Sequence, residues 1–284
     1  MKYIPIDFIK AEVIGLSPDL FESNPLLSDP VSIFNGELLT KTIYSYKNLK
    51  IKIFEGSNRI EFLGSLHTFY NNGKHNHNQF TYCAFRVALG RLNRDLGIEP
   101  HNLYLLHLEW GFNLKPLTTA KYITDRCIQH LTVNKTVGID CKIEGHYIQF
   151  KHSNYILKIY DKGKHFNLDK EVIRIEMKQT NWSEFRLSGI RTLADFIGTD
   201  KQPFLDLLIK QWERVILYDI NEDLSNDYVQ YQTCTFWDTR RKKYSNKNFK
   251  YHLDKLKSLN EEIGFNSQQY LINQIIKKGN ELQL

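Results

Sequence analysis

The 284-residue sequence contains few cysteines, and their arrangement narrows the class of protein. The four cysteines, Cys83, Cys127, Cys141 and Cys234, are widely scattered. No CxxC pair or Cys/His zinc spacing occurs, which argues against a zinc site. We therefore expect reduced thiols, mostly buried, in a cytosolic protein.

Long apolar runs and glycine-rich phosphate loops are also missing. No stretch approaches the roughly 18 apolar residues that a membrane span needs. The N-terminal segment MKYIPIDFIKAEVIGL has one early lysine but no apolar core or cleavage site, so we expect no signal peptide and no membrane partner. The absence of P-loop and Rossmann fingerprints argues against nucleotide-triphosphate hydrolysis.

The net charge is modestly positive, with 38 Lys and Arg against 32 Asp and Glu. This balance permits a polyanionic partner without requiring one. The chain is long enough for one large domain, or for one domain and a small module.

The order of expected elements predicts an α+β fold. Alternating segments predict strands over residues 3–15, 50–54, 59–70, 103–114, 147–148, 155–162 and 172–178. Helical spacing predicts helices over residues 80–96, 118–131, 192–196, 203–218, 252–263 and 267–278, and the prolines of 16–48 suggest irregular chain there. We expect an antiparallel sheet with helices packed on one face in residues 1–220, and a small helical, basic C-terminal module in residues 221–284.

Alternation also predicts an unusual set of ionisable residues on one face of this sheet. Tyr160 shares a face with Lys158 and Lys162, while Leu157 and Ile159 point the other way. The other predicted strands divide in the same manner. If these strands are neighbours, one surface collects Glu61, His67, His107, Glu109, Lys158, Tyr160, Lys162 and Glu176.

The 103–114 segment carries the pair of greatest chemical interest. Simple alternation puts Tyr104, Leu106 and Leu108 on its apolar side and His107 and Glu109 on its polar side. Histidine nitrogens and carboxylate oxygens suit Mg²⁺ or Mn²⁺ with open coordination positions. Such an ion would polarise a phosphate oxygen as a Lewis acid.

A tyrosine on the same surface would then be a candidate nucleophile. Its hydroxyl is a weak nucleophile at its free pKa of about 10. Neighbouring lysines and a metal would lower that pKa and stabilise the charge of the transition state. Each residue alone also has a plainer interpretation: a solvated strand face for His107 and Glu109, ordinary packing for Tyr160.

The segments IEFLGSLHTFYNNGKHNHNQF, LLHLEWGFNL, YILKIYDKGKH and VIRIEMK together resemble rolling-circle replication initiators. The likeness covers roughly residues 50–220 and is greatest to the gene II/X-type replication proteins of filamentous phages and to related plasmid initiators, members of the HUH endonuclease superfamily. The resemblance implies an antiparallel sheet fold and a metal-dependent nicking and joining activity on single-stranded DNA.

The resemblance also implies roles for individual residues. Tyr160 matches the nucleophile and Lys162 the lysine that contacts the phosphate, with Lys158 beside them. His107-Leu108-Glu109 replaces the superfamily's His-hydrophobic-His motif, so the ligand set stays open. The further matches are Glu61 with Ser65, the Lys74-His75-Asn76 loop, Arg174 and Glu176, and either His67 or His75 could complete the metal site.

These implications lead to a functional expectation with alternatives. The chain would nick an origin hairpin in single-stranded DNA, stay attached to the 5′ end through Tyr160 and leave a free 3′-hydroxyl. A host polymerase would extend that 3′-hydroxyl in the bacterial cytoplasm. A host helicase is expected as a further partner. The basic run Arg240-Arg241-Lys242-Lys243 would hold DNA phosphates. A relaxase or transposase of the same superfamily, a non-catalytic copy-number repressor and a structural protein are the alternatives.

Overall fold

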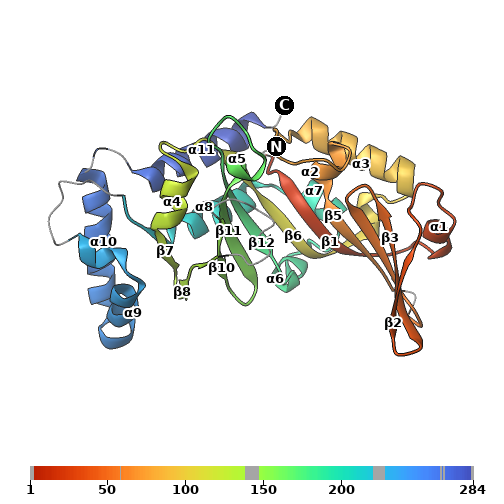
Figure 1. Ribbon diagram of the computed structural model, residues 1–284, viewed down its shortest axis with the longest axis horizontal. Coiled ribbons are helices and arrows are strands. Elements are labelled where there is room, and N and C mark those ends of the chain that lie inside the picture. The colour runs from red at the N-terminus through yellow and green to blue at the C-terminus, as the bar shows by residue number, and fades with distance from the viewer. Residues whose placement is uncertain are drawn as a thin grey trace.

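A ten-stranded antiparallel sheet organises the chain, in the order β2-β3-β4-β5-β1-β6-β12-β11-β10-β9 (Figure 1). This computed structural model describes residues 3–57, 59–137, 147–219, 228–262, 264 and 266–282. The strands of the large sheet are β1 (Ile6–Val13), β2 (Val31–Asn35), β3 (Leu38–Tyr46), β4 (Leu49–Phe54), β5 (Arg59–Ser65), β6 (Leu103–Leu114), β9 (Thr136–Val137), β10 (Tyr147–Lys151), β11 (Tyr155–Asp161) and β12 (Ile173–Gln179).

A second, three-stranded sheet and the helices complete the described structure. The small sheet has the order β13-β7-β8 and consists of β7 (Cys127–His130), β8 (Val133–Asn134) and β13 (Val215–Leu217). The helices are α1 (Asp19–Glu22), α2 (Leu66–Tyr70), α3 (Tyr82–Leu96), α4 (Ala120–Arg126), α5 (Lys162–His165), α6 (Ser183–Leu187), α7 (Leu193–Gly198), α8 (Gln202–Glu213), α9 (Cys234–Lys243), α10 (Asn246–Glu262) and α11 (Ser267–Glu281).

Helices cover one face of the large sheet, which confirms the predicted α+β class. α7 packs on β6 and α8 packs on β12 (Figure 1). The indole nitrogen of Trp110 donates to the carbonyl of Phe204 in α8, at 3.3 Å, so the apolar side of β6 faces the helices. The opposite side of the sheet is left to the ionisable residues of the same strands.

A β-bulge in β6 changes the face that several residues occupy. Lys10 of β1 lies opposite His107, but the next residue of β1 lies opposite Leu105, so Leu106 is the extra residue. Leu105 and Leu108 are both buried, whereas Leu106 and His107 are only partly so. The expectation that Leu106 shares the apolar side with Leu108 is therefore wrong, while the placement of His107 holds.

Several element boundaries differ from the sequence-based expectation for local reasons. The strand expected over residues 59–70 ends at Ser65, whose hydroxyl accepts the N–H of Thr68 at 3.0 Å and begins α2, so His67 is helical. The strand expected over 155–162 ends at Asp161, whose carboxylate accepts the N–H of Lys164 at 2.8 Å and begins α5, so Lys162 is the first residue of a helix.

Residues 16–48 also contain more regular structure than expected. They hold α1 and the β2–β3 hairpin, where Gly36 has a φ of 61°. The sequence-based expectation took this segment as irregular, but the left-handed conformation of the glycine belongs to the turn that joins the two strands. The helices expected over 118–131 and 203–218 are shorter, and their last residues pair as β7 and β13.

The residues after 228 pack in two different ways. α9 and α10 contribute Trp237 and Leu256 to a separate cluster that also holds Ile128 and Ile216 of the small sheet. α11 instead contributes to the main core, and its Gln274 accepts the N–H of Lys115 at the end of β6. The expected C-terminal module thus divides between two cores, and its boundary near residue 221 lies outside the described residues.

The described helices also bear on membrane association. None of those in the ranges given above is long and apolar enough to cross a lipid bilayer.

Gly111 of β6 offers a test of this packing. A Cβ atom there would lie 2.5 Å from the Cα of Glu176 and would also overlap the carbonyl oxygen of Ile175. We expect Gly111→Ala to force β6 and β12 apart and lower the free energy of unfolding by about 1–3 kcal/mol in urea titrations.

Gly90 is the matched control. It is exposed in α3 with no atom near the position of an added Cβ. Gly90→Ala should leave stability unchanged or raise it by about 0.5–1 kcal/mol, since alanine favours a helix interior. Equal effects of the two substitutions would contradict the close approach of β6 and β12.

Candidate active site

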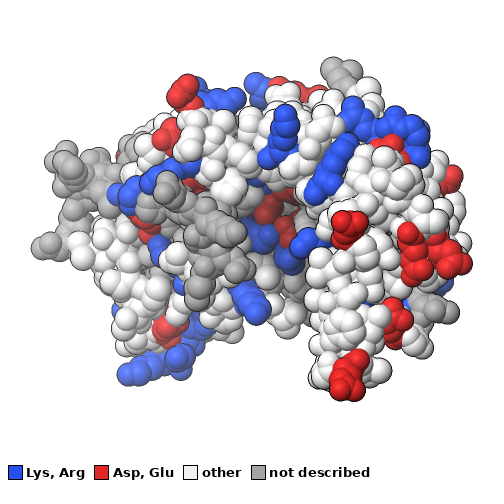
Figure 2. Space-filling model, turned by 45° about the vertical axis from the view of Figure 1, so that its right-hand side comes forward, with Lys and Arg blue, Asp and Glu red and all other residues white. Residues whose placement is uncertain are grey.

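The polar face of the large sheet is hollowed, and charged side chains of both signs lie at the floor of the hollow (Figure 2). Strands β5, β1, β6, β12 and β11 are consecutive neighbours there, so the neighbourhood assumed for the predicted polar strands is confirmed. Because register fixes which residues lie side by side, the charges form defined rows rather than a loose patch.

One row is an alternating series of lysines and carboxylates. The ammonium group of Lys158 lies 2.7 Å from Glu109 and 3.2 Å from Glu176. Glu109 also binds Lys178, at 2.9 Å. Burial would lower the pKa of Lys158, but Glu176 and Glu109 outweigh it and raise that pKa. Lys158 is therefore charged at every physiological pH.

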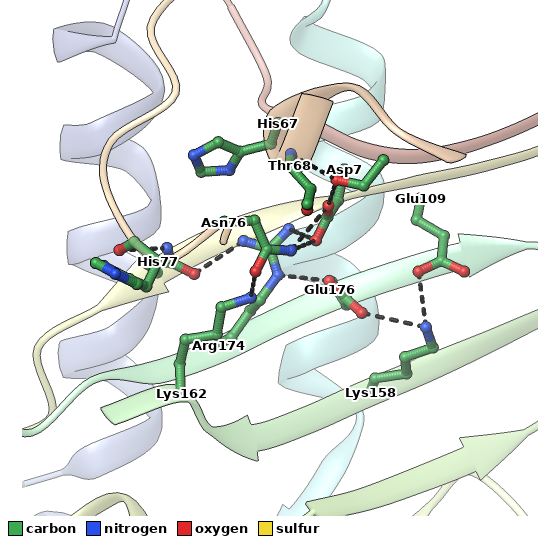
Figure 3. A network of polar contacts seen from close by, with 12 residues as sticks. Asp7, His67, Thr68, Asn76, His77, Glu109, Lys158, Lys162, Arg174 and Glu176 are labelled. Atoms are coloured by element: carbon green, nitrogen blue, oxygen red, sulfur yellow. Dashed lines mark hydrogen bonds and ion pairs between the residues drawn. The ribbon is translucent and has the colours of Figure 1, made fainter. Parts of the chain in front are cut away.

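Arg174 is the centre of a second group of contacts (Figure 3). Its guanidinium binds Glu176 at 2.5 Å, Asp7 at 3.2 Å and the amide oxygen of Asn113 at 2.8 Å. All but 2% of its surface is buried. Burial favours the neutral form, but Glu176 and Asp7 hold the pKa of Arg174 above its usual range. This side chain links three strands as a permanent cation.

Asp7 joins this group to the loop that follows α2. Its carboxylate accepts hydrogen bonds from the Ser65 hydroxyl at 2.5 Å and from the amide of Asn76 at 2.8 Å. Burial would raise the pKa of Asp7, but Arg174 and Lys162 lower it well below the ordinary value. The carboxylate is thus ionised and fully engaged.

Lys162 and Tyr160 lie at the end of this network. The ammonium nitrogen of Lys162 is 2.6 Å from the Asn76 amide oxygen (Figure 3) and 3.4 Å from the Tyr160 hydroxyl. Burial, and then Arg174, lower the pKa of Lys162 to about 8. Burial, and then Glu176, raise the pKa of Tyr160, so its hydroxyl is protonated at neutral pH.

A cavity of about 390 Å³ opens beside Arg174, between the end of β6 and α11. His67, His77, Lys115, Lys170 and Lys278 are among the residues that line it. Most of these side chains are basic or neutral, so the cavity favours an anionic or polar occupant.

Three of the four predicted metal ligands have other partners in this arrangement. Glu61 binds Lys10 at 3.2 Å, and Glu109 is held by its two lysines. His67 stacks on Phe80 and its Nε2 lies 2.6 Å from Asn78; burial lowers the pKa of this histidine to about 4.

His107 is half-buried, and burial and then Lys178 lower its pKa. No group of three His, Cys, Asp or Glu suited to a metal occurs among the residues that the structure describes. A role for His107, Glu109, Glu61 and His67 as ligands of Mg²⁺ or Mn²⁺ stays a prediction.

The remaining predicted residues lie in the loop after α2 and in α9. His75 stacks on His77 in the loop after α2, with ring centres 4.0 Å apart. The basic run of α9 lies with α10 at the far end of the molecule (Figure 1). There Arg241 donates to the carbonyl of Leu131 and stacks on an aromatic ring, whereas Lys242 and Lys243 are exposed.

Asp7, Asn76 and Lys178 are the members that sequence reasoning missed or undervalued. Asp7 lies within the strand predicted over residues 3–15, between Ile6 and Phe8. A carboxylate inside an apolar strand is rare without a buried partner, and that signal could have placed it in the site. Asn76 lies in an irregular loop, where no periodicity indicates its direction.

Comparisons with known proteins add little to this description. No protein-family model and no curated protein matches the chain. Among solved structures, the chain is similar to the rolling circle replication initiator protein from Geobacillus stearothermophilus, with 12% sequence identity and a TM-score of 0.43. The alignment covers 89% of this chain and 96% of the other. A similarity at this level assigns no activity, so the function proposed below rests on the sequence and the site.

The Asp7–Arg174 pair predicts a pH-dependent loss of stability. Asp7→Asn removes one partner of a buried ion pair and should cost about 3–5 kcal/mol of unfolding free energy at pH 7. Because the folded-state pKa of Asp7 is lowered, its contribution is complete above the unfolded-state pKa of about 3.9 and is lost as the pH falls further. The difference in unfolding free energy between wild type and Asp7→Asn should therefore become smaller below about pH 4.

Exposed Asp29 provides the control for this measurement. Asp29→Asn should change stability by no more than about 0.5 kcal/mol at any pH. Urea unfolding at pH 7, 5 and 3.5 compares the three proteins. If the difference in unfolding free energy between wild type and Asp7→Asn is as large at pH 3.5 as at pH 7, Asp7 is not part of an ionised pair.

Proposed function

We propose that this chain cuts and rejoins a single DNA strand through a covalent bond to Tyr160, as an initiator of rolling-circle replication. The supporting observation is the position of the Tyr160 hydroxyl, 3.4 Å from the amine of Lys162, on a sheet face that also carries Lys158 and Arg174. The sequence resemblance of the YILKIYDKGKH and VIRIEMK segments points to the same residues.

The charges of this face suit a phosphodiester. Arg174 and Lys158 are neutralised by carboxylates, but the hydrogen bonds of the Lys162 amine go to an amide oxygen and a phenol. A phosphate that enters beside Tyr160 would therefore meet an amine that is not already paired with a carboxylate. A pentavalent transition state would gain further from fixed positive charge in a site shielded from water.

The reaction exchanges one phosphodiester for another. The Tyr160 oxygen forms a bond to phosphorus, the bond from phosphorus to the 3′ oxygen breaks, and the 5′ end stays on the protein. The free 3′-hydroxyl serves as a primer and later attacks the phosphotyrosine, which restores the strand and the phenol. The energy of the phosphodiester is conserved throughout, so no nucleotide triphosphate is needed.

α9 is the proposed second DNA contact. Lys242 and Lys243 are exposed, and Arg240 lies between the rings of Phe236 and Tyr244. Basic groups interleaved with aromatic rings suit phosphates and stacked bases of an origin hairpin. Arg241 contributes to the packing of α9 instead, through Leu131.

The first test is the formation of a covalent protein–DNA adduct. Purified protein is mixed with oligonucleotides that tile its own genetic element, with Mn²⁺ or Mg²⁺, and analysed on denaturing gels. We expect an adduct with wild type and none with Tyr160→Phe. Tyr147→Phe is the control, because that ring packs 5.4 Å from Tyr160 on the adjacent strand and is the nearest competing phenol.

Each outcome of the gel assay is informative. An adduct that survives Tyr160→Phe but not Tyr147→Phe would keep the enzyme class and move the nucleophile. An adduct abolished by EDTA would support the predicted divalent ion. The absence of any adduct across the whole element would overturn the proposal in favour of a non-catalytic DNA-binding protein.

The proposed role of α9 predicts a change in the salt dependence of DNA binding. Each lysine that contacts a phosphate contributes about 0.9 to the slope of log K against log salt for duplex DNA. We expect Lys242→Ala with Lys243→Ala to weaken hairpin binding and reduce that slope by up to about 1.8. Lys210→Ala, at an exposed position of α8, is the control. An unchanged slope in the double variant would remove α9 from the DNA-binding surface.

A further inference from the structure

We propose that Lys162 takes the phenolic proton of Tyr160 during strand cutting and returns it during rejoining. This inference rests on the proposed nicking function and deepens it. It differs from the role that the resemblance implies for Lys162, which is to hold the phosphate as a cation. The two roles need opposite charge states of the same amine, so they can be separated by experiment.

The position of the Lys162 amine supports the first role. Lys162 begins α5, is 1% exposed, and its backbone N–H donates to the carbonyl of Val172 at 2.7 Å. The Asn76 amide oxygen accepts one N–H of the amine at 2.6 Å, and the Tyr160 hydroxyl lies 3.4 Å away. In the neutral amine, Asn76 can fix one N–H while the lone pair faces the phenol.

The carboxylates of the site are poor competitors for this proton. Glu109 and Glu176 are held by lysine and arginine side chains, and Asp7 by Arg174. The positive charges of these lysine and arginine side chains keep the pKa values of Asp7 and Glu176 low. Among the residues that the structure describes, Lys162 is the titratable group that forms a hydrogen bond with the Tyr160 hydroxyl.

The electrostatic surroundings make Lys162 a usable base near neutral pH. Burial, and then the positive charge of Arg174, lower the pKa of Lys162 to about 8. About one molecule in ten is then neutral at pH 7, and half are neutral at pH 8. A general base is most effective when its pKa lies close to the working pH.

Charged and titratable groups reach Lys162 from every element packed around it. They are Tyr160 and Lys158 of β11, Arg174 and Glu176 of β12, Asp7 of β1, His67 of α2, His77 of the following loop, and His165 of α5. Burial lowers the pKa of all three histidines, to about 4 for His67. They are therefore expected to be neutral in the range where Lys162 titrates.

The proposed step balances in both directions. In cutting, the Tyr160 oxygen bonds to phosphorus, its proton moves to the Lys162 nitrogen, the bond to the 3′ oxygen breaks, and that oxygen takes a proton from water. In rejoining, the 3′-hydroxyl gives its proton to water as it attacks phosphorus. The bond to Tyr160 then breaks, and the Lys162 ammonium returns its proton to the phenolate.

Single-turnover rates of adduct formation between pH 6 and 9.5 test the proposal. We expect the wild-type rate to rise about tenfold per pH unit and to level off near pH 8. Lys162→Arg keeps the positive charge but cannot lose a proton, so we expect a loss of at least about 100-fold and no plateau near pH 8. Lys164→Arg, the exposed lysine two residues later in α5, should leave both rate and profile unchanged.

The result that overturns the proposal is equally definite. A wild-type rate that falls as the pH rises through 8, or full activity in Lys162→Arg, would mean that Lys162 acts as a cation. Tyr160-dependent adducts would still form, so the proposed function would survive. If Lys162→Arg does not fold, as judged by circular dichroism, the wild-type profile alone decides. No Tyr160-dependent adduct at any pH would instead overturn the proposed function itself.

Discussion

The buried charge of Arg174 is the constraint on which the rest of the site depends. Its three partners, Asp7, Asn113 and Glu176, come from three neighbouring strands, so the guanidinium fixes how β1, β6 and β12 meet on the polar face. Burying such a group costs several kcal/mol, and a well-packed apolar cluster is often at least as stable. The proposed strand-cutting chemistry therefore explains the network better than the stability that the network provides.

The same constraint joins the sheet to its loops. Asp7 holds Asn76, and Asn76 holds Lys162, so a loop between α2 and α3 and the first residue of α5 share one hydrogen-bond chain. Catalytic groups on loops are placed accurately only when a rigid scaffold orders them. Here the scaffold is the row of paired charges, and loss of any member should alter the position of the Lys162 amine.

The sequence predicted the sheet and much of its polar face, because strand alternation and helical spacing depend on neighbours along the chain. Tyr160, Lys158, Glu109 and Glu176 were placed correctly on one face. The features that the sequence did not predict depend on long-range strand pairing or on local helix capping. The bulge at Leu106 depends on how β6 pairs with β1. The helical start at Lys162 depends on Asp161 as an N-terminal cap. The hydrogen-bond partners of Asp7 lie more than fifty residues away in the sequence. Likewise, a list of His and carboxylate positions could not show that lysine side chains bind Glu61 and Glu109.

Lys158 and Lys162 show why residue type alone does not assign a role. They lie four positions apart around the same tyrosine, yet their surroundings move their pKa values in opposite directions. Two carboxylates fix the charge of Lys158, whereas burial and Arg174 weaken that of Lys162. Because Glu176 binds both Lys158 and Arg174, this one carboxylate helps to set the pKa values of both lysines. A permanent cation and a titratable amine flanking one phenol provide the two properties that phosphoryl transfer to tyrosine requires: stabilised charge and a place for the proton.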